Sequence, residues 1–198
     1  MVWKTEQWMR DVFPGGDKIY VEYRQLPRRE LAIVVGAALD AALAELLSKR
    51  LHGSEPEIHS FLGVNGDGRA PCASFGARIQ LSLLTTIISQ NDAIILRAIK
   101  GIRNQFAHEV RADYNSPSLL PLIFKLHDQF LKQSNSLIEA GHLSGSSHSL
   151  DLIRPFLATT PEAGAGLLLA VFSTYQAYFH RLYERIQPVP PLELFPRA

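Results

Sequence analysis

Apolar residues return every three or four positions along most of this chain, the spacing that lets an α-helix bury one face. The ranges with this spacing are 27–51, 74–89, 92–108, 118–132 and 161–186. A shorter apolar segment, 150–157, is interrupted by Pro155. The last range would be roughly 39 Å long at the usual helical rise. The pattern therefore predicts an all-α fold, a bundle of about five to six helices with a long C-terminal helix.

The two ends of the chain depart from this pattern. Residues 1–26 form an irregular N-terminal arm with room for one short helix, and alternation at positions 19, 21 and 23 predicts a short strand or an extended lead-in. We expect Trp3 and Trp8 to pack the arm onto the bundle. Residues 188–198 are rich in proline and predict an extended tail. Residues 27–187 then form a single helical-bundle domain.

Composition narrows the classes of function. The net charge of +1 excludes the strongly basic surface that tracks nucleic-acid phosphates, so any contact with nucleic acid is expected to be local. The single cysteine, Cys72, excludes an internal disulfide framework and is typical of a reducing compartment, so we expect a cytoplasmic protein. The start of the chain lacks the apolar region of a signal peptide. The uncharged stretch between Glu162 and His180 predicts a buried bundle helix rather than a membrane span.

The helix predicted over 92–108 carries the candidate site. Its apolar stripe consists of Ile95, Ile99, Ile102 and Phe106. Arg97, Gly101, Asn104 and His108 lie near the opposite side of a helical wheel, with Arg103 on the flank. The glycine would let a second backbone approach closely. Basic residues are also common at the exposed C-terminal end of a helix, where they suit its dipole, so this face has a purely structural interpretation as well.

Other candidate chemistry is weaker. His127 and Asp128 form a dyad without a serine nucleophile on a strained turn, so hydrolase chemistry is not expected. The spacing of His142 and His148 matches no zinc pattern, and we expect no metal and no cofactor. The glycine-rich loop 54–72 lacks the ligands of calcium and phosphate loops and predicts turns.

Asp40 interrupts an apolar run in the first long helix. Because buried carboxylates need a partner, we expect it to face the surface, with a buried arginine partner as the alternative. Arg78 lies among the inward positions of the next helix and is placed to reach a carboxylate.

Two neighbouring helical segments resemble the mannitol operon repressor family of bacteria. The matching residues are Phe75, Ala77, Arg78, Ile79, Leu81, Leu84, Ile87 or Ile88, and residues 102–108. The resemblance covers about 40 residues, up to Glu109, and the flanking helices agree in type and order. It implies a helical transcriptional regulator.

The end of the second segment is also similar to the R-x4-6-H motif of the HEPN superfamily of helical bundles. Arg103, Asn104 and His108 match it. The similarity implies a metal-independent RNase site, formed where the motifs of two paired chains face each other. In such a site the imidazole would transfer the 2′-hydroxyl proton, the guanidinium would hold the phosphate, and the amide would orient either. Arg103 and His108 are about 140° apart on one helix, so only a dimer across the face of Gly101, Asn104 and His108 would bring them together.

Three interpretations follow. The first is a non-enzymatic transcriptional regulator that acts as a homodimer through protein partners, since no helix-turn-helix is apparent and sequence-specific DNA binding is not expected. Its dimer interface would contain Arg97, Gly101, Asn104 and His108. The second is a HEPN-type endoribonuclease that acts on RNA with Arg103, Asn104 and His108 as catalytic residues. In the third, Arg103 and Asn104 tie the helix end to the dimer interface or to Asp40.

Overall fold

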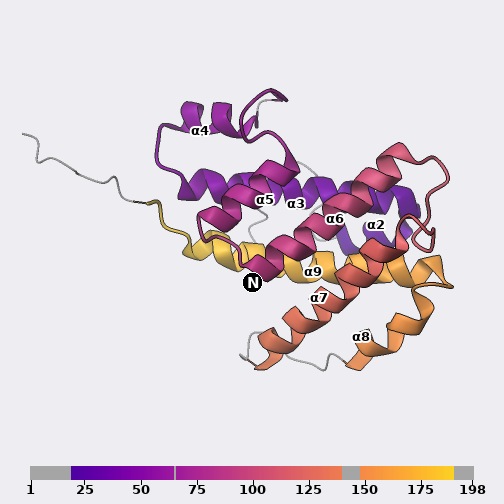
Figure 1. The fold of residues 1–198 in the computed structure, drawn as a ribbon. Coiled ribbons are helices and arrows are strands. Elements are labelled where there is room, and N and C mark those ends of the chain that lie inside the picture. The colour runs from indigo at the N-terminus through magenta and orange to yellow at the C-terminus, as the bar shows by residue number, and fades with distance from the viewer. Residues whose placement is uncertain (1–18, 65, 140–147, 190–198) are drawn as a thin grey trace, which may run out of the picture.

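The computed structural model describes residues 19–64, 66–139 and 148–189 (Figure 1). Within these ranges all of its regular secondary structure is helical, which confirms the all-α prediction. The elements are α2 (Ile19–Gln25), α3 (Arg28–Arg50), α4 (Glu55–Leu62), α5 (Phe75–Leu84), α6 (Gln90–His108), α7 (Leu120–Glu139), α8 (His148–Ile153), the 3-10 turn η2 (Arg154–Phe156) and α9 (Pro161–Arg185). Trp3, Trp8, His142 and most of the predicted tail lie outside the described residues.

Helix α3 is the centre of the bundle. It runs beside the long helix α9, and α4, α5 and α6 pack against its other sides (Figure 1). Its side chains are buried nearly all round, and Val35, Leu39 and Leu43 are inaccessible to solvent. In the described part of the chain it is the one helix long and apolar enough to cross a membrane by length and composition, with most of that stretch buried inside the bundle. A central helix of a globular core has the same composition.

The long helices lie where the apolar spacing predicts them. α3, α6 and α9 begin and end within two residues of the predicted ranges. Helix α5 begins after its predicted cap, since the Ser74 hydroxyl accepts a hydrogen bond from the Ala77 amide at 3.2 Å. It ends at Leu84, earlier than predicted, because Thr86 adopts a left-handed backbone (φ 58°) that a helix cannot contain.

The short elements differ from the predictions. Residues 19–25 form helix α2, so the predicted strand is wrong. The predicted loop 54–72 contains helix α4, which begins with a capping box between Ser54 and Glu57. Helix α7 continues to Glu139, beyond its predicted end. The short helices α2 and α4 pack on the longer helices α9 and α3, which the local pattern does not reveal.

Arg78 joins α5 to two other parts of the bundle. Its side chain is 8% exposed and donates to the Cys72 carbonyl, the Leu62 carbonyl and the Asp40 carboxylate, the last at 2.8 Å. The expectation that Asp40 faces the surface is therefore wrong, and the alternative of a buried arginine partner is confirmed. Burial raises the pKa of Asp40, and the attraction and hydrogen bond of Arg78 offset part of that rise.

Asp92 joins the start of α6 to two further helices. The Ser89 amide donates to one carboxylate oxygen at 2.9 Å, which completes a capping box. The other oxygen accepts the Tyr175 hydroxyl of α9 at 2.7 Å and the Gln133 amide of α7 at 3.3 Å. Because Asp92 is 1% exposed, these bonds replace the water that the carboxylate loses. The bonds from Tyr175 and Gln133 also fix where α6 begins relative to α9 and α7.

Candidate functional site

Helix α6 holds the candidate site between α3, α5 and α7. Its predicted stripe, Ile95, Ile99, Ile102 and Phe106, is buried, with no side chain more than 1% exposed. The helix ends at His108. Just beyond, the Glu109 carboxylate accepts hydrogen bonds from Gln105 and Ser118, which lower its pKa. The stripe therefore fixes how the polar side chains of α6 are directed.

Three of the predicted site residues remain together on the surface. Arg97, Asn104 and His108 are exposed, and they follow one another along a single line of α6, which we call the α6 seam. Arg97 also donates to the Gln80 side chain of α5 at 2.8 Å. The seam thus presents a guanidinium, an amide and an imidazole to solvent.

Gly101 serves a contact within the chain. A β-carbon built on Gly101 would lie 3.0 Å from a methyl carbon of Leu122, on α7. The close approach expected at this glycine is thus made by α7 of the same molecule. On the flank of the seam opposite to Gly101, the Lys100 ammonium lies close to Gly76, in the first turn of α5. Neighbouring helices therefore cover both flanks of the seam.

Arg103 turns away from the seam and towards α3. A β-carbon built on Gly36 would lie 2.6 Å from Cδ and 3.0 Å from Cβ of Arg103, so the arginine stem crosses α3 at this glycine. Gly36 is buried and Arg103 is half-buried. The positive charge of Arg103 also contributes to lowering the pKa of Asp40, after the two effects of Arg78. Arg103 is thus part of the contact between α3 and α6.

The three residues that resemble the RNase motif are therefore divided. Asn104 and His108 lie on the exposed seam, and Arg103 lies in the helix contact. Within one chain the stem of Arg103 is directed towards α3, whereas His108 faces solvent. The residue that explains the division is Gly36, and its signal in the sequence was a lone glycine in an alanine-rich helix.

The other predicted chemistry has structural partners. His127 is 1% exposed, and its two ring nitrogens lie 3.1 Å from the Asp128 carboxylate and 2.8 Å from the Leu150 carbonyl. Hydrogen bonds from Arg154 and from His127 lower the pKa of Asp128. The dyad therefore connects α7 to the segment of α8 and η2. Among residues 19–64, 66–139 and 148–189, no group of three or more His, Cys, Asp or Glu side chains is placed to hold a metal ion.

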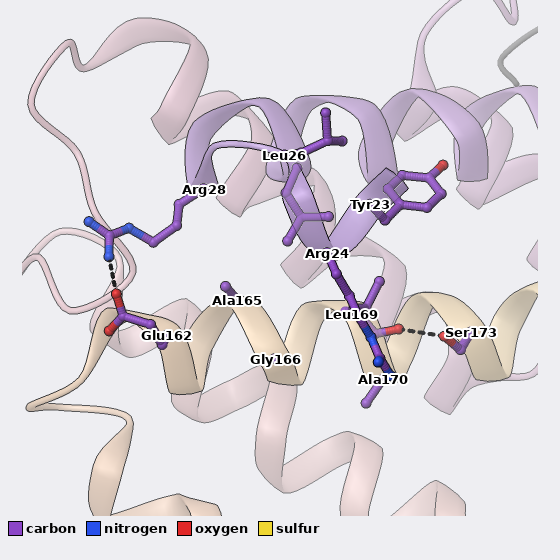
Figure 2. A pocket seen from close by; sticks show the side chains of 11 residues that line it. Tyr23, Arg24, Leu26, Arg28, Glu162, Ala165, Gly166, Leu169, Ala170 and Ser173 are labelled. Carbon is purple, nitrogen blue, oxygen red and sulfur yellow. Dashed lines mark hydrogen bonds and ion pairs between the residues drawn. The ribbon is translucent and has the colours of Figure 1, made fainter. Parts of the chain in front are cut away.

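A cavity of about 540 Å³ lies on another side of the bundle, between α2, the start of α3 and α9 (Figure 2). None of the predicted site residues lines it. Comparisons with family models, with curated proteins and with solved structures gave no match to this chain.

Proposed function

We propose that this protein is a non-enzymatic regulator that associates as a dimer through the α6 seam and acts through protein partners. This is the role that the resemblance to mannitol operon repressors implies. The observation that supports it best is that the side chains of Arg103 and His108 lie on different faces of α6. Arg103 lies against Gly36 in the contact between α3 and α6, whereas His108 lies on the exposed seam.

This divergence disfavours the RNase alternative. An RNase site needs the imidazole at the 2′-hydroxyl and a cation at the same phosphate, in one geometry. To reach a phosphate at the seam, the Arg103 side chain would have to leave Gly36 and withdraw its charge from the half-buried carboxylate of Asp40. That movement would weaken the packing of α6 on α3, so Arg103 is better suited to its structural role.

The seam has the character of a protein-contact surface. Arg97, Asn104 and His108 offer directional hydrogen bonds along one helix, and arginine is enriched at protein interfaces. None of the three cavities lined by described residues contains a seam residue. A second helix laid along the seam could bond to all three side chains at once, as a dimer partner would.

The test combines oligomeric state with RNA cleavage. The variant Arg97→Glu/His108→Glu places two negative charges on the seam, and Arg185→Glu places one at the exposed end of α9 as a control. We expect a wild-type dimer by light scattering, a dissociation constant at least tenfold weaker in the seam variant, and little change in the control. Tenfold corresponds to about 1.4 kcal/mol. Melting temperatures should stay close to wild type, because exposed side chains contribute little to folding.

RNA incubated with the wild-type protein should remain intact. Cleavage that leaves 2′,3′-cyclic ends, lost in His108→Ala and Arg103→Ala variants that still dimerise, would replace the proposal with the RNase alternative. A wild-type protein that is monomeric at every concentration tested would refute the dimer. A dimer that the seam variant leaves intact would place the interface elsewhere.

A further inference from the structure

The cavity between α2 and α9 has the size of a small-molecule site. Its volume of about 540 Å³ lies within the roughly 300–1,000 Å³ that such sites occupy. It is bounded by the last turn of α2, the first turn of α3 and the first half of α9 (Figure 2). It lies apart from the α6 seam, so the inference drawn from it does not rest on the proposed function.

The floor of the cavity is a length of α9 with small side chains. Ala165, Gly166 and Ala170 lie along it, and Leu26 and Leu169 add apolar walls. A β-carbon built on Gly166 would meet no atom within 4 Å, so the floor there is open backbone. An apolar group of a ligand can therefore lie on α9 without displacing a side chain, and burying its surface there would favour binding.

The polar groups at the two ends of the cavity are not equivalent. At one end Arg28 is neutralised, because it pairs with Glu162 across the cavity and with Asp113 at 2.8 Å. At the other end the Arg24 guanidinium forms no hydrogen bond or ion pair with another described residue. Figure 2 shows the Arg24 side chain reaching from α2 across the cavity towards Leu169 and Ala170. Among the described residues that line the cavity, Arg24 is thus the one positive charge without an ionic partner, and it is directed over the apolar floor.

We propose that this cavity binds a small organic anion, a carboxylate or a phosphate ester with an apolar body. Arg24 would form the paired hydrogen bonds that a guanidinium makes to either head group. The apolar body would lie over Gly166 and against Leu169. The ligand would then bridge α2 and α9, and its binding would stabilise the folded chain by mass action.

Isothermal titration calorimetry on the full chain tests this assignment with defined probes. Benzoate and phenyl phosphate carry the two head groups on one apolar ring, and benzyl alcohol is the neutral match. Arg24→Gln removes the charge from an exposed position, and Gly166→Phe fills open space. Arg185→Gln removes a cation that does not line the cavity. Circular dichroism checks that each variant retains its helices.

We expect at least one of the two anions to bind with one ligand per chain, and benzyl alcohol to bind at least tenfold more weakly. Both Arg24→Gln and Gly166→Phe should weaken binding at least tenfold, and Arg185→Gln should not. The tighter of benzoate and phenyl phosphate identifies the head group. The assignment is overturned if neither anion binds, if benzyl alcohol binds as tightly, or if both cavity variants bind like wild type.

Discussion

At the scale of single residues, two helical glycines have opposite surroundings. Gly36 of α3 is crossed by the Arg103 side chain, whereas Gly166 of α9 faces open space. A glycine inside a helix costs about 0.5–1 kcal/mol relative to alanine, because it loses more backbone entropy on folding. Any difference between the two positions therefore reports what a methyl group meets, and not the helix propensity.

We predict that alanine will have opposite effects at these positions. Gly166→Ala should raise the free energy of unfolding by about 0.5–1 kcal/mol. Gly36→Ala should lower it by about 1–3 kcal/mol, because its β-carbon would overlap the Arg103 stem in a packed contact. Urea unfolding of both variants measures this. If Gly36→Ala were as stable as Gly166→Ala, Arg103 could not lie across α3, and its side chain would be free to reach a phosphate at the seam.

The candidate site shows where prediction from the sequence reaches its limit. A helical wheel orders the residues of one helix by angle, and it placed Ile95 and Phe106 inward and Asn104 and His108 outward, as the structure has them. The wheel does not say which neighbouring helices cover the two sides of the polar face of α6. That Arg103 faces Gly36 follows from the crossing of α6 over α3, which depends on contacts between positions 67 residues apart.

At the scale of elements, the long helices were predictable because their apolar stripes are themselves the cause of their packing. Helix α4 carried a readable signal, since Ser54 and Glu57 have the spacing of a capping box, but the glycines after it favoured a loop. The alternation at positions 19, 21 and 23 resembled a strand, but these residues belong to the seven-residue helix α2. Tyr23 of this helix is buried against Phe172 of α9. Packing on a longer neighbour therefore stabilises both short helices.

Arg78 provides the prediction at this scale, because it holds α5 to α3 and to the end of α4. Arg78→Met would leave the half-buried Asp40 without its ion pair and should cost about 3–5 kcal/mol at neutral pH. Arg78→Lys, the matched control, keeps the charge and should cost less. Thermal or urea unfolding measures both. A loss below about 1 kcal/mol in Arg78→Met would mean that Asp40 stays well solvated.

The pH dependence of Arg78→Met has a defined sign. Burial already raises the pKa of Asp40, and removing Arg78 removes the main effects that lower it, so the pKa rises further. The folded variant then binds a proton that the unfolded chain binds only at lower pH. Its stability deficit relative to wild type should therefore shrink as the pH falls from about 7 towards 4. A deficit that stays constant or grows over this range would contradict the assignment.

At the scale of the whole molecule, two buried polar centres, the residues Arg78 and Asp92, each hold a different set of helices together. Arg78 connects α5 with α3 and α4, and Asp92 connects α6 with α7 and α9. The centres share no hydrogen-bonding partner among the described residues. The apolar core that runs from α3 to α6 and α9 joins them, together with the hydrogen bond from Arg97 of α6 to Gln80 of α5. If that core makes the bundle one cooperative unit, damage to either centre should lower the stability of the whole.

We therefore predict additive effects in the double variant Arg78→Lys/Asp92→Asn. Asp92→Asn weakens the cap of α6 and the bond from Tyr175, and should cost about 1–3 kcal/mol. With no shared partner, the two losses should sum to within about 0.5 kcal/mol, with one unfolding transition by circular dichroism and by fluorescence. Two separate transitions would show that the halves unfold independently. A double variant more stable than the sum would show that the two centres are coupled.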